Sequence, residues 1–113
     1  MKNYEEISKE EIYNIINHDN TCLLSLIDKN KPLTIPMYYQ ISNEDNKLYF
    51  NFKNLNSDRK TNIIKNNNNV QILLYSKSWG STDTIIIKGT ASVNEEDIKV
   101  EPEEIIGKRY YPY

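Results

Sequence analysis

The sequence has a single cysteine, Cys22, in 113 residues, which excludes an internal disulfide and a cysteine-based zinc site. It has no apolar run near the ~20 residues of a membrane-spanning helix, and its first residues lack the apolar segment of a secretory signal. The net charge is only −2 and the pI about 5.4, which argues against a nucleic-acid or anionic-membrane surface. We therefore expect one cytoplasmic domain over residues 1–113, since a chain of this length supports one hydrophobic core.

Several arrangements that carry hydrolytic or metal chemistry are also missing. The chain has one histidine and three glycines, and it shows no Ser/His/Asp set, no metal-spaced His/Cys cluster and no phosphate-cradling glycine loop. His18 is expected at a helix end, where the dipole favours a cation, and Cys22 in a hydrophobic strand, where a thiol is unreactive. Any redox chemistry would therefore come from a bound cofactor.

Two helices are predicted from capping and spacing signals. Ser8 followed by Glu11 forms a capping box, so the first helix begins after Ser8. The second helix is predicted over about residues 58–67, with Ser57 as its N-cap and a left-handed asparagine within 66–69 at its end.

The remaining apolar segments predict β-strands. Gly89 is expected to mark a bend or bulge, and the tail offers either a strand at residues 98–101 or a helix beginning at Pro102. Five or six short strands with two short helices, and no regular βαβ alternation, indicate a mainly β fold, a small antiparallel barrel. The strands are expected over residues 21–27, 33–41, 47–53, 70–76 and 84–93.

The most informative charges are those of Arg59 and Lys60, at the start of the second predicted helix. The chain has 12 lysines and only two arginines, so each arginine is expected to serve a geometric purpose. Cations at a helix N-terminus oppose the dipole by up to ~1 kcal/mol each, and a bound anion would remove that conflict. The alternative is two solvated surface cations beside a capping serine.

With these features in this order, the chain resembles the FMN-binding split-barrel family, which includes the pyridoxamine-phosphate oxidases and the general-stress flavoproteins. The likeness covers about residues 8–94 and rests on a hairpin, the strand LYFNFK, the helix opened by S-D-R-K, and then VQILLY, Trp79 and TIIIKGTA. The resemblance implies a split β-barrel that forms a homodimer with two FMN sites between the subunits.

The resemblance also assigns individual contacts. Arg59 and Lys60 would grip the FMN phosphate. Asn51 and Phe52 would contact the phosphate and the ribityl chain. The strand residues that would lie along the isoalloxazine ring are Ile35, Pro36, Met37, Tyr38 and Gln40. Thr84 and Ile85 would reach the flavin from the partner subunit.

The expected function is that of an FMN-binding flavoprotein, an oxidoreductase that acts on a small-molecule substrate or electron donor. No catalytic side chain is assigned. No metal, nucleic acid or membrane is expected as a partner. Residues 105–113 supply only Lys108 and Arg109 as cations, too few for a second phosphate, so oxidation of pyridoxamine phosphate is not expected. A barrel that binds flavin or another ligand without catalysis remains the alternative. An oligonucleotide-binding barrel is disfavoured by the pI. Trp79 could cover a ligand, lie in a dimer seam or simply pack.

Overall fold

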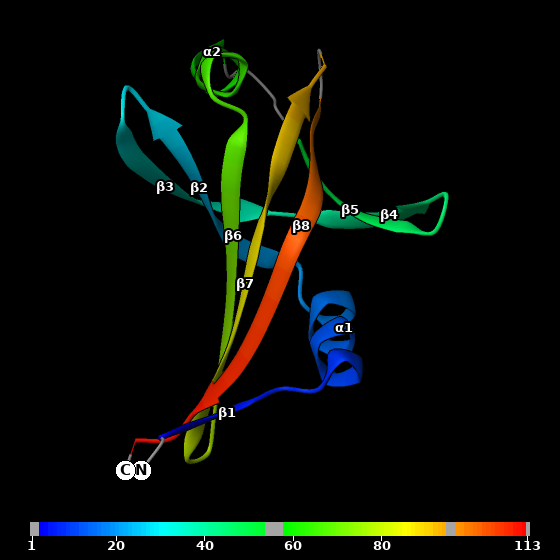
Figure 1. Ribbon diagram of the computed structural model, residues 1–113, viewed down its shortest axis with the longest axis vertical. Helices are drawn as coiled ribbons and strands as arrows, with labels where there is room; N and C mark the ends of the chain where they lie inside the picture. The colour runs from blue at the N-terminus through cyan, green and yellow to red at the C-terminus, as the bar shows by residue number, and fades with distance from the viewer. Residues whose placement is uncertain (1–2, 54–57, 95–96, 113) are drawn as a thin grey trace.

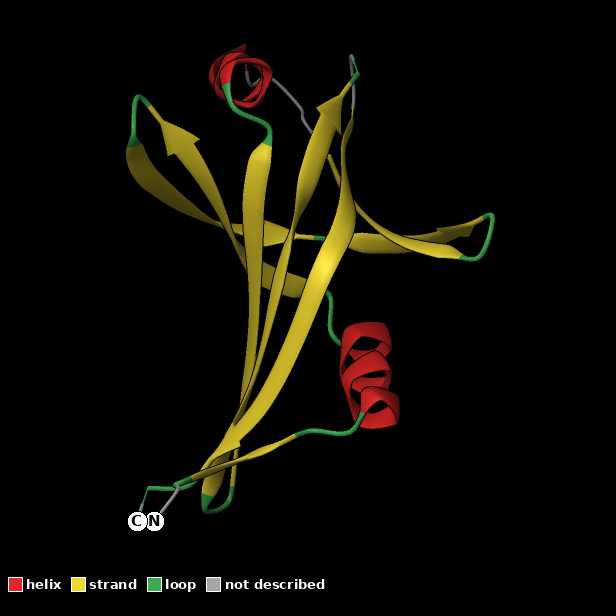
Figure 2. Ribbon diagram, in the orientation of Figure 1, coloured by secondary structure: helices red, strands yellow, loops and turns green. Residues whose placement is uncertain are grey.

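One strongly curved antiparallel sheet and two helices make up the structure, a computed structural model that describes residues 3–53, 58–94 and 97–112 (Figures 1 and 2). The helices are α1 (Lys9–His18) and α2 (Asp58–Asn66). The strands are β1 (Tyr4–Glu6), β2 (Thr21–Asp28), β3 (Lys31–Tyr38), β4 (Gln40–Glu44), β5 (Lys47–Lys53), β6 (Asn69–Ser78), β7 (Ser81–Val93) and β8 (Asp97–Tyr110).

Hydrogen bonding orders the strands β3-β2-β6-β7-β8-β5-β4, and β1 pairs with the end of β8. The two edge strands, β3 and β4, follow each other directly in the chain across Tyr39. The sheet therefore curls round until β3 comes into contact with β5, although the two strands are not paired. This confirms the predicted split β-barrel, and it leaves an opening where the two ends of the sheet diverge.

The eight strands exceed the five or six that were expected. The expected strand 33–41 is divided at Tyr39. The Tyr39 N–H still donates to the Asn20 carbonyl (2.9 Å), one residue beyond the last β2–β3 pair, and from Gln40 on the chain pairs with β5 instead. β1 has no apolar alternation to signal a strand, and it forms because β8 offers an edge to pair with. Residues 97–110 form one long strand, so the helix considered at Pro102 is wrong.

Pro102 lies opposite Gly89, where the pairing of β7 with β8 shifts by one residue. A proline, which has no N–H to donate, is tolerated at such a bulge, and this explains why the strand continues through it. The predicted bulge at Gly89 is confirmed by this shift, in which Glu103 of β8 is the extra residue, and Gly89 lies so close to β8 that a Cβ atom there would be 2.3 Å from the Glu101 carbonyl oxygen. Neither atom belongs to a flexible side chain, so the strands would have to move apart.

We therefore expect Gly89→Ala to lower the free energy of unfolding by about 1–3 kcal/mol, the usual cost of forcing extra atoms into a packed site. Urea denaturation measures this change. Lys88→Ala, at the exposed neighbouring position, is the control and should stay within about 0.5 kcal/mol of the wild type. Equal stability of the two variants would show that the bulge needs no glycine.

The core is built by alternate residues of the strands together with one face of each helix. In α1 the Glu11 N–H donates to the Ser8 hydroxyl (3.2 Å), which confirms the predicted N-cap. Ile12 and Ile16 of α1 are buried, and α1 lies against β8 at Gly107, where a Cβ atom would come within 2.7 Å of the Ile12 side chain. The fully buried strand residues include Leu24, Leu26, Phe50, Phe52, Ile72, Leu74, Ile85, Ile87, Ile98 and Val100.

α2 lies across one end of the barrel and buries Ile63 and Ile64, as predicted (Figure 1). The predicted left-handed asparagine at its end is wrong, since positive φ angles among the described residues occur only in two hairpin turns and at Gly80. Instead, the Asn67 N–H donates to the Ile63 carbonyl, and the Asn67 side chain accepts from the Asn69 N–H (3.0 Å). The proposed N-cap, Ser57, lies outside the described residues. Neither described helix has the length and apolar character required to cross a bilayer.

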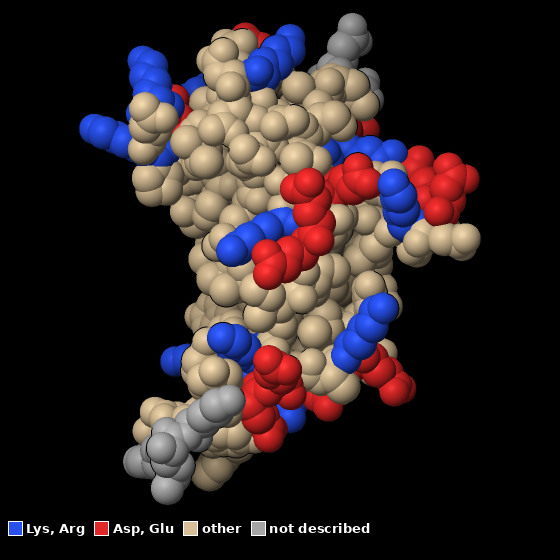
Figure 3. All heavy atoms as spheres, viewed as in Figure 1, with Lys and Arg blue, Asp and Glu red and all other residues tan. Residues whose placement is uncertain are grey.

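The outer face of β2, β6, β7 and β8 carries an apolar row. Leu23, Leu73, Ile86 and Ile106 are aligned by the strand register and lie half-exposed, between neighbours that face the core. Figure 3 shows that much of this face bears no charged side chain. Trp79, at the turn between β6 and β7, is fully exposed, so its ordinary packing within the chain is excluded.

Candidate functional site

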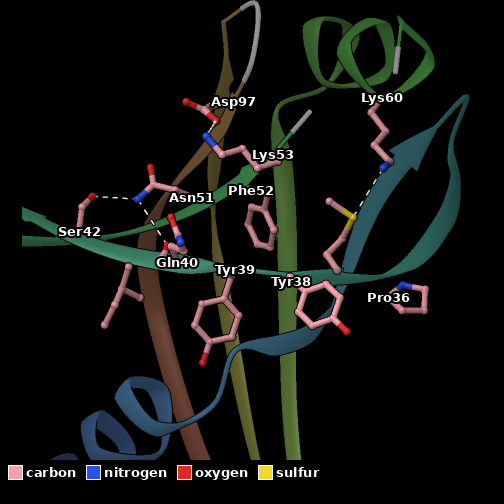
Figure 4. Close-up of a pocket in the computed structure, with 12 residues that line it drawn as sticks. Pro36, Tyr38, Tyr39, Gln40, Ser42, Asn51, Phe52, Lys53, Lys60 and Asp97 are labelled. Atoms are coloured by element: carbon pink, nitrogen blue, oxygen red, sulfur yellow. Dashed lines mark hydrogen bonds and ion pairs between the residues drawn. The ribbon is translucent and has the colours of Figure 1, made fainter. Parts of the chain in front are cut away.

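A pocket of about 620 Å³ lies in the opening of the split barrel. It is bounded by the end of β3, the start of β4, the end of β5 and the first turn of α2 (Figure 4). The side chains around it are Pro36, Met37, Tyr38, Tyr39, Gln40, Ile41, Ser42, Asn51, Phe52, Lys53, Lys60 and Asp97.

One wall of the pocket is the edge strand β3, whose outer side is not paired with another strand in the described part of the chain. Tyr39 N–H points back toward β2, so by the alternation of an antiparallel ladder the backbone groups of Tyr38 and Pro36 point away from β2. Proline is accepted at position 36 for this reason, because its missing N–H would have faced outward. The strand thus offers the Tyr38 N–H and the Tyr38 and Pro36 carbonyls as hydrogen-bonding groups at the pocket.

Apolar and aromatic side chains accompany this backbone edge. Pro36 and Tyr38 are exposed, with 75% of Tyr38 accessible, whereas Met37 is half-buried against the core. Tyr39 is buried with its ring 5.1 Å from that of Phe50, and its hydroxyl donates to the Ile16 carbonyl (2.7 Å). Burial, with a smaller contribution from Asp19, raises the pKa of the Tyr39 hydroxyl. Tyr39 is therefore neutral and held in one position, and it fixes the backbone where β3 ends beside the pocket.

The opposite side of the pocket is polar and comes from the pairing of β4 with β5. Asn51 lies opposite Gln40 in this ladder. Its amide nitrogen donates to the Ser42 hydroxyl (2.9 Å) and, more weakly, to the Gln40 carbonyl (3.4 Å). These bonds fix the amide of Asn51, which leaves its carbonyl oxygen as an acceptor for a hydroxyl-bearing ligand.

Charged side chains gather at the end of the pocket nearest α2. Lys60, from the first turn of α2, extends over β3, with its ammonium 3.6 Å from the Met37 sulfur. Lys53, the last residue of β5, forms an ion pair with Asp97, the first residue of β8 (3.3 Å). Figure 4 shows the two ammonium groups on either side of Phe52. This end of the pocket is suited to an anion.

Arg59 is not part of the pocket lining in the described chain. It points toward the β2–β3 hairpin, where its guanidinium lies 3.4 Å from the Asp28 carboxylate and remains 72% exposed. The expected Arg–Lys pair is therefore divided, with Lys60 at the pocket and Arg59 beside it. An exposed ion pair of this length is weak, so its rupture would cost little.

Seven of the eleven residues assigned to the cofactor line this one pocket: Pro36, Met37, Tyr38, Gln40, Asn51, Phe52 and Lys60. Ile35 packs on the core, and Ile85 is buried on the inner side of β7. The Thr84 hydroxyl on β7 donates to the Lys108 carbonyl on the neighbouring strand β8 (3.3 Å). The resemblance assigned Thr84 and Ile85 to the partner's site, so their distance from this pocket agrees with that assignment without testing it.

The pocket also contains residues that sequence reasoning missed: Tyr39, Ile41, Ser42, Lys53 and Asp97. Lys53 ends a predicted strand six residues before Arg59, and that position could have signalled it. Asp97 had no such signal, because it reaches the site only through the pairing of β8 with β5.

Arg109, the second arginine, has a structural place away from the pocket. Its guanidinium binds the Asp83 carboxylate through two nitrogens (2.8 and 3.2 Å), and it also contacts Glu11 (2.7 Å) and Glu5 (3.5 Å). These hydrogen bonds raise the pKa of Arg109. Arg109 thus joins α1, β1, β7 and β8 and is already neutralised by carboxylates.

The pocket residues fit a flavin. An apolar wall with outward backbone donors and acceptors matches a planar ring with a polar edge, Asn51 matches a hydroxylated chain, and the lysines match a phosphate. The pocket is open on one side, and Tyr38 stands exposed at its rim. A ring bound there would keep one face uncovered by this chain.

Comparison with known proteins points in the same direction. Residues 7–103 match the family model described as pyridoxamine 5'-phosphate oxidase like. No curated protein matches the sequence.

Several solved structures share the fold. An FAD-binding protein from Mesorhizobium loti has a TM-score of 0.81 at 11% identity, covering 94% of this chain and 96% of that one. An FAD-binding protein from Mycobacterium smegmatis has a TM-score of 0.69 at 17% identity, with coverages of 95% and 98%. General Stress Protein 26 from Bacillus anthracis has a TM-score of 0.66 at 27% identity, with coverages of 88% and 92%.

Proposed function

Because this chain belongs to the pyridoxamine 5'-phosphate oxidase-like family, we propose that it binds FMN in the pocket of the split barrel and uses it to oxidise or reduce small molecules. The observation that carries the proposal is the meeting of seven sequence-assigned residues in one pocket with a cationic end. The names of the similar structures, which include two FAD-binding proteins, support a flavin as the ligand.

Each part of the pocket has a task in this proposal. The outward backbone of Pro36 and Tyr38 would orient the polar edge of the ring. Asn51 would accept from a ribityl hydroxyl, and Lys60 with Lys53 would bind the phosphate beside the positive end of α2. Arg59 would reach the same phosphate by leaving Asp28. Bound flavin supplies the electron transfer, and the chain supplies position and charge.

We propose that a second copy of the chain covers the apolar row Leu23, Leu73, Ile86 and Ile106, and that each copy completes the flavin site of the other. A row of this kind across four strands is typical of an interface. We expect light scattering at micromolar concentration to give the mass of a homodimer, about twice 13.3 kDa. A monomer that still retains FMN would contradict the shared site.

Oxidation of pyridoxamine phosphate is not part of this proposal. A second phosphate beside the flavin would need further cations, and the one C-terminal arginine, Arg109, is bound to Asp83, Glu11 and Glu5 away from the pocket. In this proposal Lys53 and Lys60 would already bind the flavin phosphate. A planar acceptor without a phosphate, such as a quinone or a nitroaromatic compound, suits the uncovered ring better.

The test is anaerobic mixing of the FMN-loaded protein with a reduced nicotinamide, while the flavin absorbance is followed. We expect bleaching within seconds and recovery when a quinone or nitroaromatic compound is added, with no turnover of pyridoxamine phosphate. A flavin spectrum in the purified protein that the nicotinamide leaves unchanged would favour the alternative, a barrel that binds flavin without this catalysis. Absence of any flavin binding would contradict the proposal as a whole.

A further inference from the structure

One carboxylate stands at the end of the pocket that is suited to an anion. Asp97 lines the pocket together with Lys53 and Lys60, and these three are the charged side chains among the described lining residues. Asp97 Oδ1 lies 3.3 Å from Lys53 Nζ, and 37% of the Asp97 side chain is accessible (Figure 4). An anion that approaches Lys53 therefore meets a negative charge beside it.

From this arrangement we propose that Asp97 competes with the flavin phosphate for Lys53 and so limits how tightly the chain retains FMN. The inference rests on the proposed function, and it adds a residue that sets affinity and exchange at that site. Lys53 is paired with Asp97 in the structure, and a bound phosphate would have to share Lys53 with Asp97 or take its place.

The charges at this end of the pocket give the direction of the effect. Two lysines and one aspartate give a net charge of +1, whereas a phosphate monoester carries about −1.5 to −2 at neutral pH. Replacing Asp97 with an amide raises this sum by one positive charge, whether or not Arg59 also reaches the phosphate, and so favours the phosphate-bound state. Asp97 is partly exposed, so solvent and salt reduce its repulsion without removing it. Riboflavin, which has no phosphate, is insensitive to this balance.

The experiment compares FMN and riboflavin affinities, by quenching of flavin fluorescence, in the wild type and Asp97→Asn at low ionic strength. We expect Asp97→Asn to bind FMN about three- to tenfold more tightly and to release it correspondingly more slowly on dilution, with riboflavin affinity changed less than twofold. The gain should shrink as salt is added.

Glu101→Gln provides a matched control on the same strand. Glu101 pairs with Lys47 (3.1 Å) outside this pocket, so the control removes one carboxylate and one ion pair of β8 without altering the site. It should leave FMN affinity unchanged. Lys53→Gln is the complementary variant, and we expect it to weaken FMN binding about tenfold and riboflavin binding less than twofold.

The outcomes separate this inference from the proposed function. If the wild type binds FMN and Asp97→Asn binds it no more tightly, or if Glu101→Gln produces the same gain, the role of Asp97 is refuted while the flavin site stands. If Asp97→Asn strengthens FMN and riboflavin equally, the effect is not on the phosphate and the inference is again wrong. If neither flavin binds any variant, the proposed function itself fails and the inference with it.

Discussion

Replacing both Arg59 and Lys60 with alanine is expected to weaken FMN binding about 100-fold while changing riboflavin affinity less than about threefold. A hydrogen bond from a charged donor contributes roughly 1.5–3 kcal/mol, and the double replacement removes at least one such donor from the phosphate. The structure indicates that Arg59 and Lys60 contribute unequally to this loss of FMN affinity. Lys60 lines the pocket, whereas Arg59 begins from its ion pair with Asp28, so Lys60→Ala alone should account for most of the loss.

Lys65→Ala is the control for this prediction. Lys65 lies in the last turn of the same helix, is exposed, and does not line the pocket, so the control removes one positive charge, as Lys60→Ala alone does, but at the other end of α2. Thermal unfolding of the apoprotein should show that the double variant folds, since Arg59 and Lys60 lie in the first turn of α2 and neither is buried in the core. Equal loss of FMN and riboflavin, or no loss of either, would refute a phosphate site here.

The thiol of Cys22 is expected to react with a disulfide reagent at least 100-fold more slowly in the folded protein than in denaturant at pH 8. Burial raises the pKa of Cys22 to about 12, from an ordinary value of 9.0. At pH 8 the thiolate fraction then falls about 1000-fold, and the thiolate is the reacting species. Cys22→Ala with Ser78→Cys places a thiol in an exposed position and should react at once.

Flavin binding should slow this labelling further. Cys22 is buried in the core and pairs across the ladder with Met37 of the pocket wall, so we expect openings that expose the thiol to disturb β3 as well. A ligand that binds only the closed form, at 100 times its dissociation constant, should slow labelling through that opening about 100-fold. Saturating FMN that leaves the labelling rate unchanged would show that the flavin does not bind beside β3.

The same pKa shift predicts how stability depends on pH. The folded pKa of Cys22 is raised, so the neutral thiol stabilises the fold at all pH values below about 9, where the unfolded thiol is also protonated. This contribution is lost as the pH rises between about 9 and 12, because the unfolded state alone releases the proton. Cys22→Ala should therefore lose stability less steeply than the wild type across that range.

Much of the fold could be predicted because its signals are local. The capping serine of α1, the alternation in β5 and the paired isoleucines of α2 each specify an element within a few residues, and each was confirmed. The break at Tyr39 and the long strand β8 were missed, because they depend on pairings with Asn20 and with β7 that are far apart in sequence.

The candidate site divides in the same way. Residues on one strand or at one helix start, such as Pro36 and Lys60, were proposed from the sequence and do lie at the pocket. Asp97 was not proposed, since β8 brings it beside Lys53 from 44 positions along the chain. The orientation of Arg59 toward Asp28 also had no sequence signal, because the β2–β3 hairpin and α2 are adjacent only in the folded chain.

The exposed position of Trp79 decides what its fluorescence can report. It is the sole tryptophan of the chain, and it lies on a turn outside the barrel, in contact with water in the isolated folded chain. Its emission maximum should therefore already resemble that of free indole, and denaturant should hardly shift it. A shift to shorter wavelength during a titration would instead mean that another molecule has covered the β6–β7 turn, which makes this single indole a probe of association and not of unfolding.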